Sequence, residues 1–362
     1  MMMSGGVDSS VGASVLLEQG HEVIGVFMKC WSVEQLESLG ASDDLYGCFW
    51  EEDSNDARLV ANKLNIPFYV WDFEKEYKKG VVDYMLNEYK SGRTPNPDVM
   101  CNSIIKFGIF YKQAMSLGAD FVATGHYAKI VNDSNKFSIL RGNDLNKDQS
   151  YFLWKIQREQ LSRTLFPIGE FSAKSEVRKF AEFRDLITAN KPDSQGLCFI
   201  GQTPLRELLL QTLGKSEGDI LDESGNFLGK HPGAFLFTIG QRNGLGLSGG
   251  PWFVSKTDIE KNLVFVSHQG KEQSLYGKFL IAKEPNWQID ISDLGSDFQC
   301  QAQIRYRQEP TNCRVKIHKD EILVEFDDEI RAISPGQSIV FYIDKEMLGG
   351  AVIHSKTNIN YT

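Results

Sequence analysis

The spacing of apolar and polar residues changes partway along the chain. In the first half, short apolar runs at residues 23–27, 67–73 and 121–124 alternate with segments of helical periodicity. Those helical segments are expected at residues 11–19, 55–64, 75–89 and 104–117. A short apolar run between helices is typical of a strand that is covered on both faces. This half therefore predicts an α/β domain with a doubly wound parallel sheet, which binds ligands at the carboxyl ends of its strands.

The pattern differs after about residue 172. Residues 172–186 are expected to form a helix rich in charge. From residue 218 onward, Gly, Asn and Asp separate short alternating runs, at residues 219–221, 263–267, 313–317 and 322–326. Such punctuation is typical of hairpins and barrels. Residues 285–291 are expected to join this region to a final barrel-like module.

Length and composition indicate a globular protein of more than one domain. At 362 residues the chain favours two or three domains. No apolar run approaches the ~20 residues of a membrane helix, and no basic region followed by an apolar core marks a secretory signal. The net charge of -9 argues against a protein that coats nucleic acid nonspecifically. A shaped site with local positive charge remains open, since basic residues gather at 174–184 and 305–307.

The six cysteines form no metal-binding pattern. They lie at positions 30, 48, 101, 198, 300 and 313, without C-x-x-C spacing and without clustered histidines. We therefore expect no structural zinc site, and thiols held in a reducing compartment, the cytoplasm. Inert packing is the usual role of a lone buried cysteine, and it is kept for Cys30, Cys48, Cys300 and Cys313.

The most specific local motif is SGGVDSS at residues 4–10, directly before the helix expected at 11–19. Two glycines allow a tight turn close to an anion, and the amides and dipole of the helix start attract that anion. Ser9 and Ser10 can donate hydroxyl hydrogen bonds, and Asp8 can help to hold Mg²⁺. A plain glycine turn with serine caps is the alternative. Without a lysine after the glycines the motif is not a Walker loop. It resembles the pyrophosphate loop of the N-type ATP pyrophosphatases, which activate an oxygen atom as its adenylate.

A second glycine-rich motif, at residues 244–249, lacks the structural context that its usual function requires. Residues 244–249 fit the G-x-G-x-x-G pattern of dinucleotide-binding proteins. However, Gly250-Pro251-Trp252 follows, and no helix is expected to open there. We therefore interpret this segment as a loop in β structure.

Further segments narrow the family. They are residues 93–102 (RTPNPDVMCN), 123–127 (ATGHY), 147–152 (KDQSYF), 193–200 (DSQGLCFI), 240–246 (GQRNGLG) and 305–308 (RYRQ). In this order, and together with the pyrophosphate loop, they resemble the tRNA-specific 2-thiouridylases over nearly the whole chain. The resemblance implies a catalytic ATP pyrophosphatase domain at residues 1–203, a central tRNA-binding linker domain at 204–275 and a C-terminal β-barrel at 276–362.

The resemblance also implies a reaction. ATP, used with Mg²⁺, would adenylate the O2 atom of uridine 34 in tRNAs for Lys, Glu and Gln. A persulfide on Cys198, loaded by a protein sulfur donor, would then replace that oxygen, and AMP would leave. Cys101 would act on the persulfide or form a disulfide with Cys198, and Asp98 would be the general acid or base beside the flipped base. Cysteine is the side chain that can carry such sulfur.

Positions in this sequence match two sets of ligand contacts in the family, one for ATP and one for tRNA. For ATP they are Met2, Met3, Ser4, Gly5, Gly6, Val7, Asp8, Ser9, Met28 and Gly125. For tRNA they are Asn96, Pro97, Asp98, His126, Lys147, Asp148, Gln149, Arg305, Tyr306 and Gln337. Structural alternatives remain for some of them. His126 alone could be a satisfied core histidine, Asp98 a turn residue, and Arg305 and Arg307 a solvated strand face.

The sequence departs from the family pattern at two places. Only Met1-Met2-Met3 precedes the glycine turn, and three residues cannot make a full central strand. Residues 30–50 differ from the usual loop and receive no role. Two other functions therefore stay open. A noncatalytic tRNA-binding homologue would bind tRNA without consuming ATP, and an amidating ligase would exchange ATP and pyrophosphate without regard to tRNA.

Overall fold

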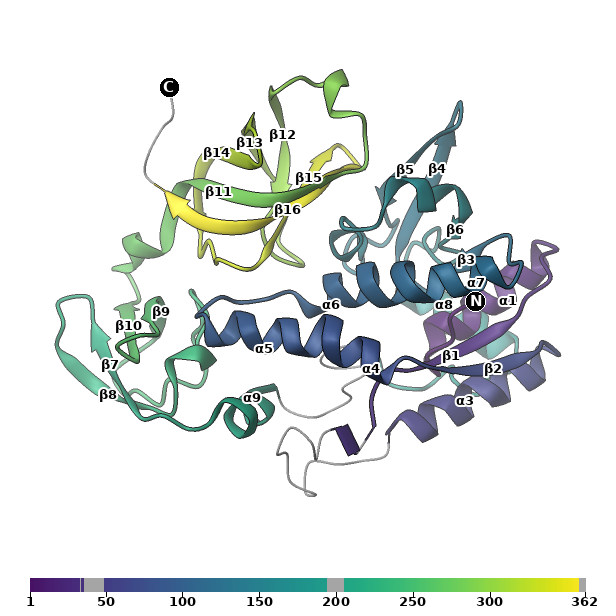
Figure 1. Cartoon of the computed structure of the whole chain (residues 1–362), viewed down its shortest axis with the longest axis horizontal. Helices are drawn as coiled ribbons and strands as arrows, with labels where there is room; N and C mark the ends of the chain where they lie inside the picture. The colour runs from purple at the N-terminus through teal and green to yellow at the C-terminus, as the bar shows by residue number, and fades with distance from the viewer. Residues whose placement is uncertain (33, 36–48, 194–204, 358–362) are drawn as a thin grey trace. The chain divides into compact units, whose positions relative to one another are not determined.

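The computed structural model describes residues 1–32, 34–35, 49–193 and 205–357, and its elements are labelled in Figure 1. The chain divides into two compact units. The first takes in residues 1–82, 97–204 and 344–348, and the second takes in residues 83–96, 205–343 and 349–362. No helix within the described ranges is long and apolar enough to cross a membrane.

A parallel sheet forms the centre of the first unit. Strand β1 (Gly25–Lys29) pairs in parallel with β2 (Phe68–Asp72), and β3 (Val122–Ala123) pairs in parallel with β6 (Thr164–Leu165). Met1–Met3 connects the two pairs, because Met3 N donates to Val26 O and Met2 N donates to Ala123 O. These residues form an isolated bridge rather than a full strand, as expected, yet they still join β1 to β3. The predicted α/β fold with a parallel sheet is confirmed.

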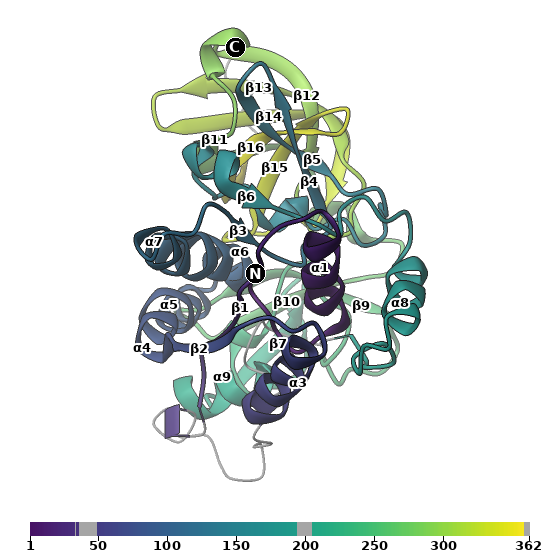
Figure 2. The same cartoon turned by 90° about the vertical axis from the view of Figure 1, so that its right-hand side faces the viewer.

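Helices cover this sheet and bury its apolar residues. Helix α1 (Val7–Glu18) packs against α8 (Lys174–Phe183), as Figure 2 shows, and α3 (Phe49–Lys63) packs against β1 and β2. One core cluster combines Val11 of α1, Phe27 of β1, Val60 of α3 and Val177 of α8. Helix α1 is built from small and apolar residues that are buried on nearly every side, which is the composition of a central helix.

Two longer helical runs contain π-helical segments. The first run consists of α4 (Glu74–Tyr77), the π-helical η2 (Lys78–Val82) and α5 (Asp83–Lys90), where residues 75–89 were expected. The second consists of α6 (Pro97–Met100), the π-helical η3 (Cys101–Phe110) and α7 (Tyr111–Ser116), where residues 104–117 were expected. Proline at the first helical position explains the earlier start of the second run, since that position needs no N–H donor.

The first unit also carries a hairpin that the sequence patterns did not predict. Strands β4 (Ala128–Asp133) and β5 (Lys136–Arg141) are antiparallel and joined by Ser134 and Asn135, both with positive φ. Two residues of positive φ make the turn that suits a two-residue hairpin. Short 3₁₀ helices η4 (Ser150–Phe152) and η5 (Arg158–Arg163) follow the hairpin.

The second unit begins its main segment with α9 (Leu205–Leu213) and a four-stranded sheet. The strands are β7 (Gly218–Asp222), β8 (Phe227–His231), β9 (Trp252–Asp258) and β10 (Leu263–His268), in the order β8-β7-β10-β9. Only the β7–β10 pair is parallel among these described strands. A short 3₁₀ helix, η6 (Ala234–Leu236), lies between β8 and β9.

A closed antiparallel barrel completes the second unit. Its strands are β11 (Tyr276–Trp287), β12 (Asp297–Gln303), β13 (Thr311–His318), β14 (Glu321–Arg331), β15 (Ser338–Ile343) and β16 (Glu346–Thr357), with η7 (Glu272–Leu275) and η8 (Ile291–Asp293) as short connections. The order β11-β14-β13-β12-β15-β16 closes where β16 pairs with β11. Closure leaves no free strand edge, which removes a template for aggregation.

The join expected at residues 285–291 is wrong, because β11 already runs through Pro285 to Trp287. Its pairing with β16 shifts register between Lys283 and Asn286, and Glu284 has φ 54°. A proline is tolerated in a strand at such an irregularity, since the ladder needs no N–H there. Pro285 therefore marks a bulge within the barrel rather than its boundary.

Candidate functional site

The glycine turn lies at the start of α1, at one end of the parallel sheet. The helix begins at Val7, four residues before the expected start, and Gly6 is its N-cap with φ -97° and ψ 164°. Gly5 has φ 74°, and a Cβ atom there would lie 2.2 Å from the Asp53 carbonyl oxygen of α3. A side chain at position 5 is therefore excluded by both strain and space. The first amides of α1 are left for an anion.

The serines of the motif stabilise the turn itself. Ser9 Oγ accepts from Ser4 N at 3.1 Å and donates to Gly6 O at 3.1 Å. Ser10 Oγ donates to Gly6 O at 2.8 Å, and both side chains are buried. The hydroxyl protons of Ser9 and Ser10, which were expected to bind phosphate, are therefore donated to the Gly6 carbonyl. The backbone amides remain as the main donors of the turn.

Asp8 is held by two groups from distant parts of the chain. Lys174 Nζ donates to both carboxylate oxygens of Asp8 at 2.7 Å each, and Tyr127 Oη donates to Asp8 Oδ1 at 2.7 Å. Burial, then the nearby negative charge of Asp8, raises the pKa of Tyr127, so its hydroxyl stays protonated as a donor. Lys174 is the first residue of α8, and the sequence motifs did not identify it as a site residue.

A second carboxylate, Asp193, collects three cations. Lys147 Nζ lies 2.8 Å, Arg178 Nη2 2.8 Å and Lys174 Nζ 3.1 Å from its oxygens. Burial alone would raise the pKa of Asp193, but the hydrogen bonds from Lys147 and Lys174 outweigh it and lower that pKa to about 2. We call Asp8, Asp193, Lys147, Lys174 and Arg178 the charge cluster. Its three cations exceed its two carboxylates, which suits a phosphate ligand.

The end of β3 packs directly on the glycine turn. A Cβ atom at Gly125 would lie 2.9 Å from Asp8 C and Ser9 N, so only glycine permits this approach. His126 follows, buried, with Thr124 Oγ1 2.6 Å from Nδ1 and Lys106 Nζ 3.5 Å from Nε2. Burial, and then the charge of Lys106, holds the pKa of His126 well below its usual value. The imidazole is neutral and partnered, as the alternative of a satisfied core histidine describes.

Cys101 is a fully buried thiol at the start of the π-helical segment η3. Burial raises its pKa to about 12, while the charge of Lys106 acts to lower it and that of Asp98 to raise it. A π-helix forms its hydrogen bonds from i to i+5, so residues 101 and 106 lie near the same face. The charge of Lys106 therefore acts on both Cys101 and His126. No sequence motif identified Lys106.

Residues 147–149 hold their loop against the sheet. The buried Asp148 carboxylate accepts from Arg141 Nε at 2.7 Å, Gly142 N at 3.0 Å, Ser150 N at 3.1 Å and Ser150 Oγ at 3.1 Å. Gln149 exchanges two hydrogen bonds with the backbone of Tyr127, at 2.9 and 3.0 Å. Both side chains are thus occupied within the protein, and contact of this loop with tRNA remains a prediction.

The second unit contains four residues that were expected to contact tRNA, which are Asn96, Arg305, Tyr306 and Gln337. Gln337 Nε2 donates to the carbonyls of Thr94 and Pro95 at 3.0 Å each, which fixes the backbone just before the buried Asn96. Arg305 Nη2 donates to Ile239 O at 2.7 Å, Ser334 Oγ at 2.6 Å and Ala332 O at 3.1 Å. Arg307 lies 5.3 Å from the ring centre of Tyr306. Arg305 is therefore held by backbone carbonyls rather than placed on a solvated strand face.

Four of the residues expected at the ATP site can act only through their backbone. The side chains of Met2, Met3, Val7 and Met28 are buried in the core. Cys198, the expected sulfur carrier, lies outside the described residues. So does most of the segment 30–50, which includes Cys48.

Comparisons with known proteins cover all parts of the chain. Residues 1–202 match the tRNA methyl transferase HUP domain, residues 206–268 the tRNA methyl transferase PRC-barrel domain, and residues 278–353 the aminomethyltransferase beta-barrel domain. A likeness to the structure of NMN synthetase from Francisella tularensis, at 16% identity and TM-score 0.31, covers 53% of this chain and 64% of that chain. It is too slight to carry an argument.

Curated relatives match along nearly their whole length. Two of them, from Staphylococcus aureus strains bovine RF122 / ET3-1 and JH9, are each described as tRNA-specific 2-thiouridylase MnmA. Each is 48% identical over 356 residues, covering 97% of this chain and 93% of the relative. With the three domain matches in the same order, this identity shows that the chain belongs to the tRNA-specific 2-thiouridylase family.

Proposed function

We propose that the protein is a tRNA-uridine 2-sulfurtransferase that activates the uridine O2 atom with ATP and replaces it with sulfur. The observation that carries the proposal is the glycine turn of α1 beside the charge cluster. Amides at a helix start and an excess of cations are both complementary to phosphate oxygens. Family membership supplies tRNA as the substrate and uridine C2 as the position modified.

The ATP step follows from this arrangement. The triphosphate binds to the amides of the turn, and the ammonium of Lys174 moves its contacts from Asp8 to phosphate oxygens. Asp8 would then be the residue that helps to hold Mg²⁺, which commonly takes only one or two protein carboxylates and would supply positive charge for the phosphates. The uridine O2 attacks the α-phosphorus, and pyrophosphate leaves.

Sulfur transfer completes the reaction. The terminal sulfur of a Cys198 persulfide attacks C2, the C2–O2 bond breaks, and O2 departs with AMP. The thiolate of Cys101 attacks Cys198 Sγ, so the sulfur remains on the base and a Cys101–Cys198 disulfide forms; alternatively, Cys101 attacks first and releases hydrosulfide for the same substitution. Either route leaves a disulfide that an external thiol must reduce. Lys106 favours the Cys101 thiolate against its burial.

The substrate details are part of the same proposal. The uridine is position 34 of tRNAs for Lys, Glu and Gln, flipped from its stack beside Asn96, Pro97 and Asp98. Asp98 serves as the general acid or base. A partner protein delivers the persulfide to Cys198, and the reaction takes place in the cytoplasm. Lys147 and Tyr306 contact the RNA, while His126 and Arg305, which are bonded within the protein, position the segments around them.

The test uses an unmodified tRNA transcript, ATP and a persulfide donor. We expect 2-thiouridine, AMP and pyrophosphate in equal amounts, and Cys198→Ser should abolish the thiolated product while tRNA binding persists. Normal thiolation by Cys198→Ser would rule out the sulfur route.

The same assay separates the two alternatives. A noncatalytic homologue would bind tRNA tightly and produce no AMP. An amidating enzyme would exchange ATP with pyrophosphate whether or not tRNA is present, whereas the proposal requires the uridine for net AMP formation.

A further inference from the structure

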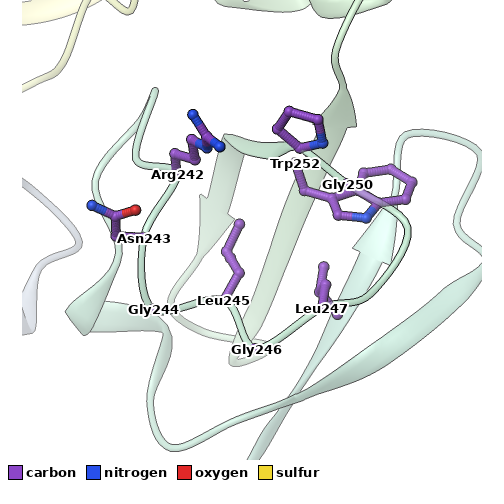
Figure 3. Close-up of a pocket in the computed structure, with 9 residues that line it drawn as sticks. Arg242, Asn243, Gly244, Leu245, Gly246, Leu247, Gly250 and Trp252 are labelled. Carbon is purple, nitrogen blue, oxygen red and sulfur yellow. The ribbon is translucent and has the colours of Figure 1, made fainter.

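A pocket in the second unit is lined by the loop between η6 and β9, which the proposed chemistry does not use (Figure 3). Its walls come from residues 242–247 and 250–252, and its volume is about 350 Å³. That volume lies at the small end of the roughly 300–1,000 Å³ of ligand sites. The loop contains the glycine motif of residues 244–249, and no helix opens there, so the dinucleotide interpretation is excluded as expected.

The hydrogen bonds of this loop leave it with free donors. Three of its carbonyls have partners: Gln241 Nε2 donates to Asn243 O at 2.9 Å and Trp252 Nε1 to Ser248 O at 3.0 Å, and His268 Nε2 lies 2.9 Å from Gly249 O. By contrast, no backbone N–H from residue 242 to 250 donates to an acceptor in the described part of the chain. The N–H groups of residues 242–250 are therefore available to an anion.

The charged side chains near the loop also favour an anionic ligand. Arg242 is exposed at the pocket and forms no ion pair with the described residues. Arg206 lies behind the loop, since a Cβ atom at Gly244 would be 3.3 Å from its Nη1. No Asp or Glu occurs between Glu223 and Asp258, although the chain as a whole carries a net charge of -9. The only charged side chain of the pocket lining is therefore the Arg242 cation, among the described residues.

The pocket lining also includes the apolar side chains of Leu245, Leu247, Pro251 and Trp252. Figure 3 shows Arg242 on one side of the pocket and Trp252 on the other, with the Leu245 side chain between them. The indole of Trp252 is braced edge to face by His268, with ring centres 4.8 Å apart. An aromatic ring held in place beside an arginine offers a stacking surface for a base and a contact for its phosphate.

We propose that this pocket binds one unstacked nucleotide of the substrate tRNA. The phosphodiester contacts Arg242 and the loop amides, and the base lies against Trp252 and Leu245. The pocket lining holds a single cation, which matches the one charge of a backbone phosphodiester better than the several charges of a free nucleotide phosphate. The proposal rests on tRNA as the substrate and adds a contact remote in sequence from the reacting cysteines.

The experiment measures the equilibrium Kd of full-length tRNA, and kcat and KM for thiolation, with pocket variants. We expect Arg242→Glu and Trp252→Ala each to weaken tRNA binding about tenfold and to raise KM, with kcat unchanged. Trp252→Phe should retain most of the affinity, since it keeps a stacking surface. Arg242→Ala should lower the number of ions released on binding by about one.

The matched control is Lys261→Glu, a charge reversal at an exposed lysine beyond the other end of β9. It should change the tRNA Kd less than twofold. Equal losses with Lys261→Glu and Arg242→Glu would show a general effect of charge and overturn the pocket. So would unchanged tRNA affinity in Arg242→Glu and Trp252→Ala, or AMP binding that depends on these residues when tRNA binding does not.

Wild-type activity separates the two proposals. If the wild-type protein thiolates tRNA and the pocket variants have normal KM, the pocket inference fails while the proposed function stands. If the wild-type protein forms no thiolated tRNA, the proposed function fails, and the Kd measurements alone decide the pocket.

Discussion

Replacing Lys174 by alanine should weaken ATP binding without unfolding the protein. Lys174 supplies both 2.7 Å contacts to the Asp8 carboxylate and a 3.1 Å contact to Asp193, and its side chain is only 14% exposed. In the proposed complex this ammonium binds the phosphates of ATP. Its removal also leaves the charge cluster with two cations for two carboxylates, so the excess positive charge is lost.

The size of the effect follows from the bond that is removed. A hydrogen bond between charged groups contributes about 1.5–3 kcal/mol. Each 1.4 kcal/mol is about tenfold in affinity, so we expect the Kd of ATP to rise by roughly 10- to 150-fold. The fold should survive, because Tyr127 still donates to Asp8, and Lys147 and Arg178 still contact Asp193.

The assay is calorimetric titration of the protein with a non-hydrolysable ATP analogue and Mg²⁺, combined with thermal unfolding. Lys174→Arg should recover part of the affinity. Lys179→Ala is the matched control, because Lys179 is an exposed lysine five residues further along the same helix. An analogue Kd within threefold of wild type in Lys174→Ala, with the control also unchanged, would refute the role of Lys174 in phosphate binding.

Three further predictions concern the residues around the glycine turn. Gly125→Ala should abolish ATP binding in the same titration, because the added methyl would meet Asp8 C and Ser9 N at 2.9 Å; normal binding would show that the contact is not needed. Alkylation of Cys101 should accelerate about tenfold per pH unit from pH 7 to 10 without a plateau, since the pKa of its thiol is raised to about 12, and should be slower in Lys106→Ala. A plateau near pH 8.5 would indicate an ordinary thiol. The folded-state pKa of His126 is depressed below 6.5, so the unfolded chain takes up the proton first and stability is lost as pH falls below about 6.5. Urea unfolding at pH 7 and 5 should show a smaller loss for His126→Gln than for wild type, and equal losses would contradict the neutral assignment.

Local patterns were sufficient for most elements and for the glycine turn, because these depend on residues close in sequence. The parallel sheet, most helices of the first unit and the β-rich second half were predictable from periodicity, whereas the β4–β5 hairpin and α9 were not predicted. The start of α1 was placed too late, since Val7 to Ser10 are already helical and the hydroxyls of Ser9 and Ser10 donate back to Gly6 O. Pro285 was read as a boundary because a bulge that tolerates proline depends on the partner strand.

The charge cluster could be predicted only in part. Asp8 belongs to a motif, and the basic stretch from residue 174 was visible, but the pairing of Lys174 with Asp8 spans 166 positions and follows from the packing of α8 on α1. The relation of Lys106 to Cys101 depends on π-helical geometry, which no periodicity signal indicated. Asp148 matched a ligand-binding position, yet its carboxylate bonds within the protein, because a motif shows which residue is present and not which way it points.

The fate of the replaced oxygen tests the central claim most directly. A tRNA transcript carrying ¹⁸O at the O2 atom of uridine is incubated with the protein, ATP and a persulfide donor, and the products are analysed by mass spectrometry. Activation by adenylation predicts that each thiolated uridine releases one AMP whose phosphate contains the ¹⁸O atom. Thiolated tRNA with unlabelled AMP, and the label found in water, would contradict the account.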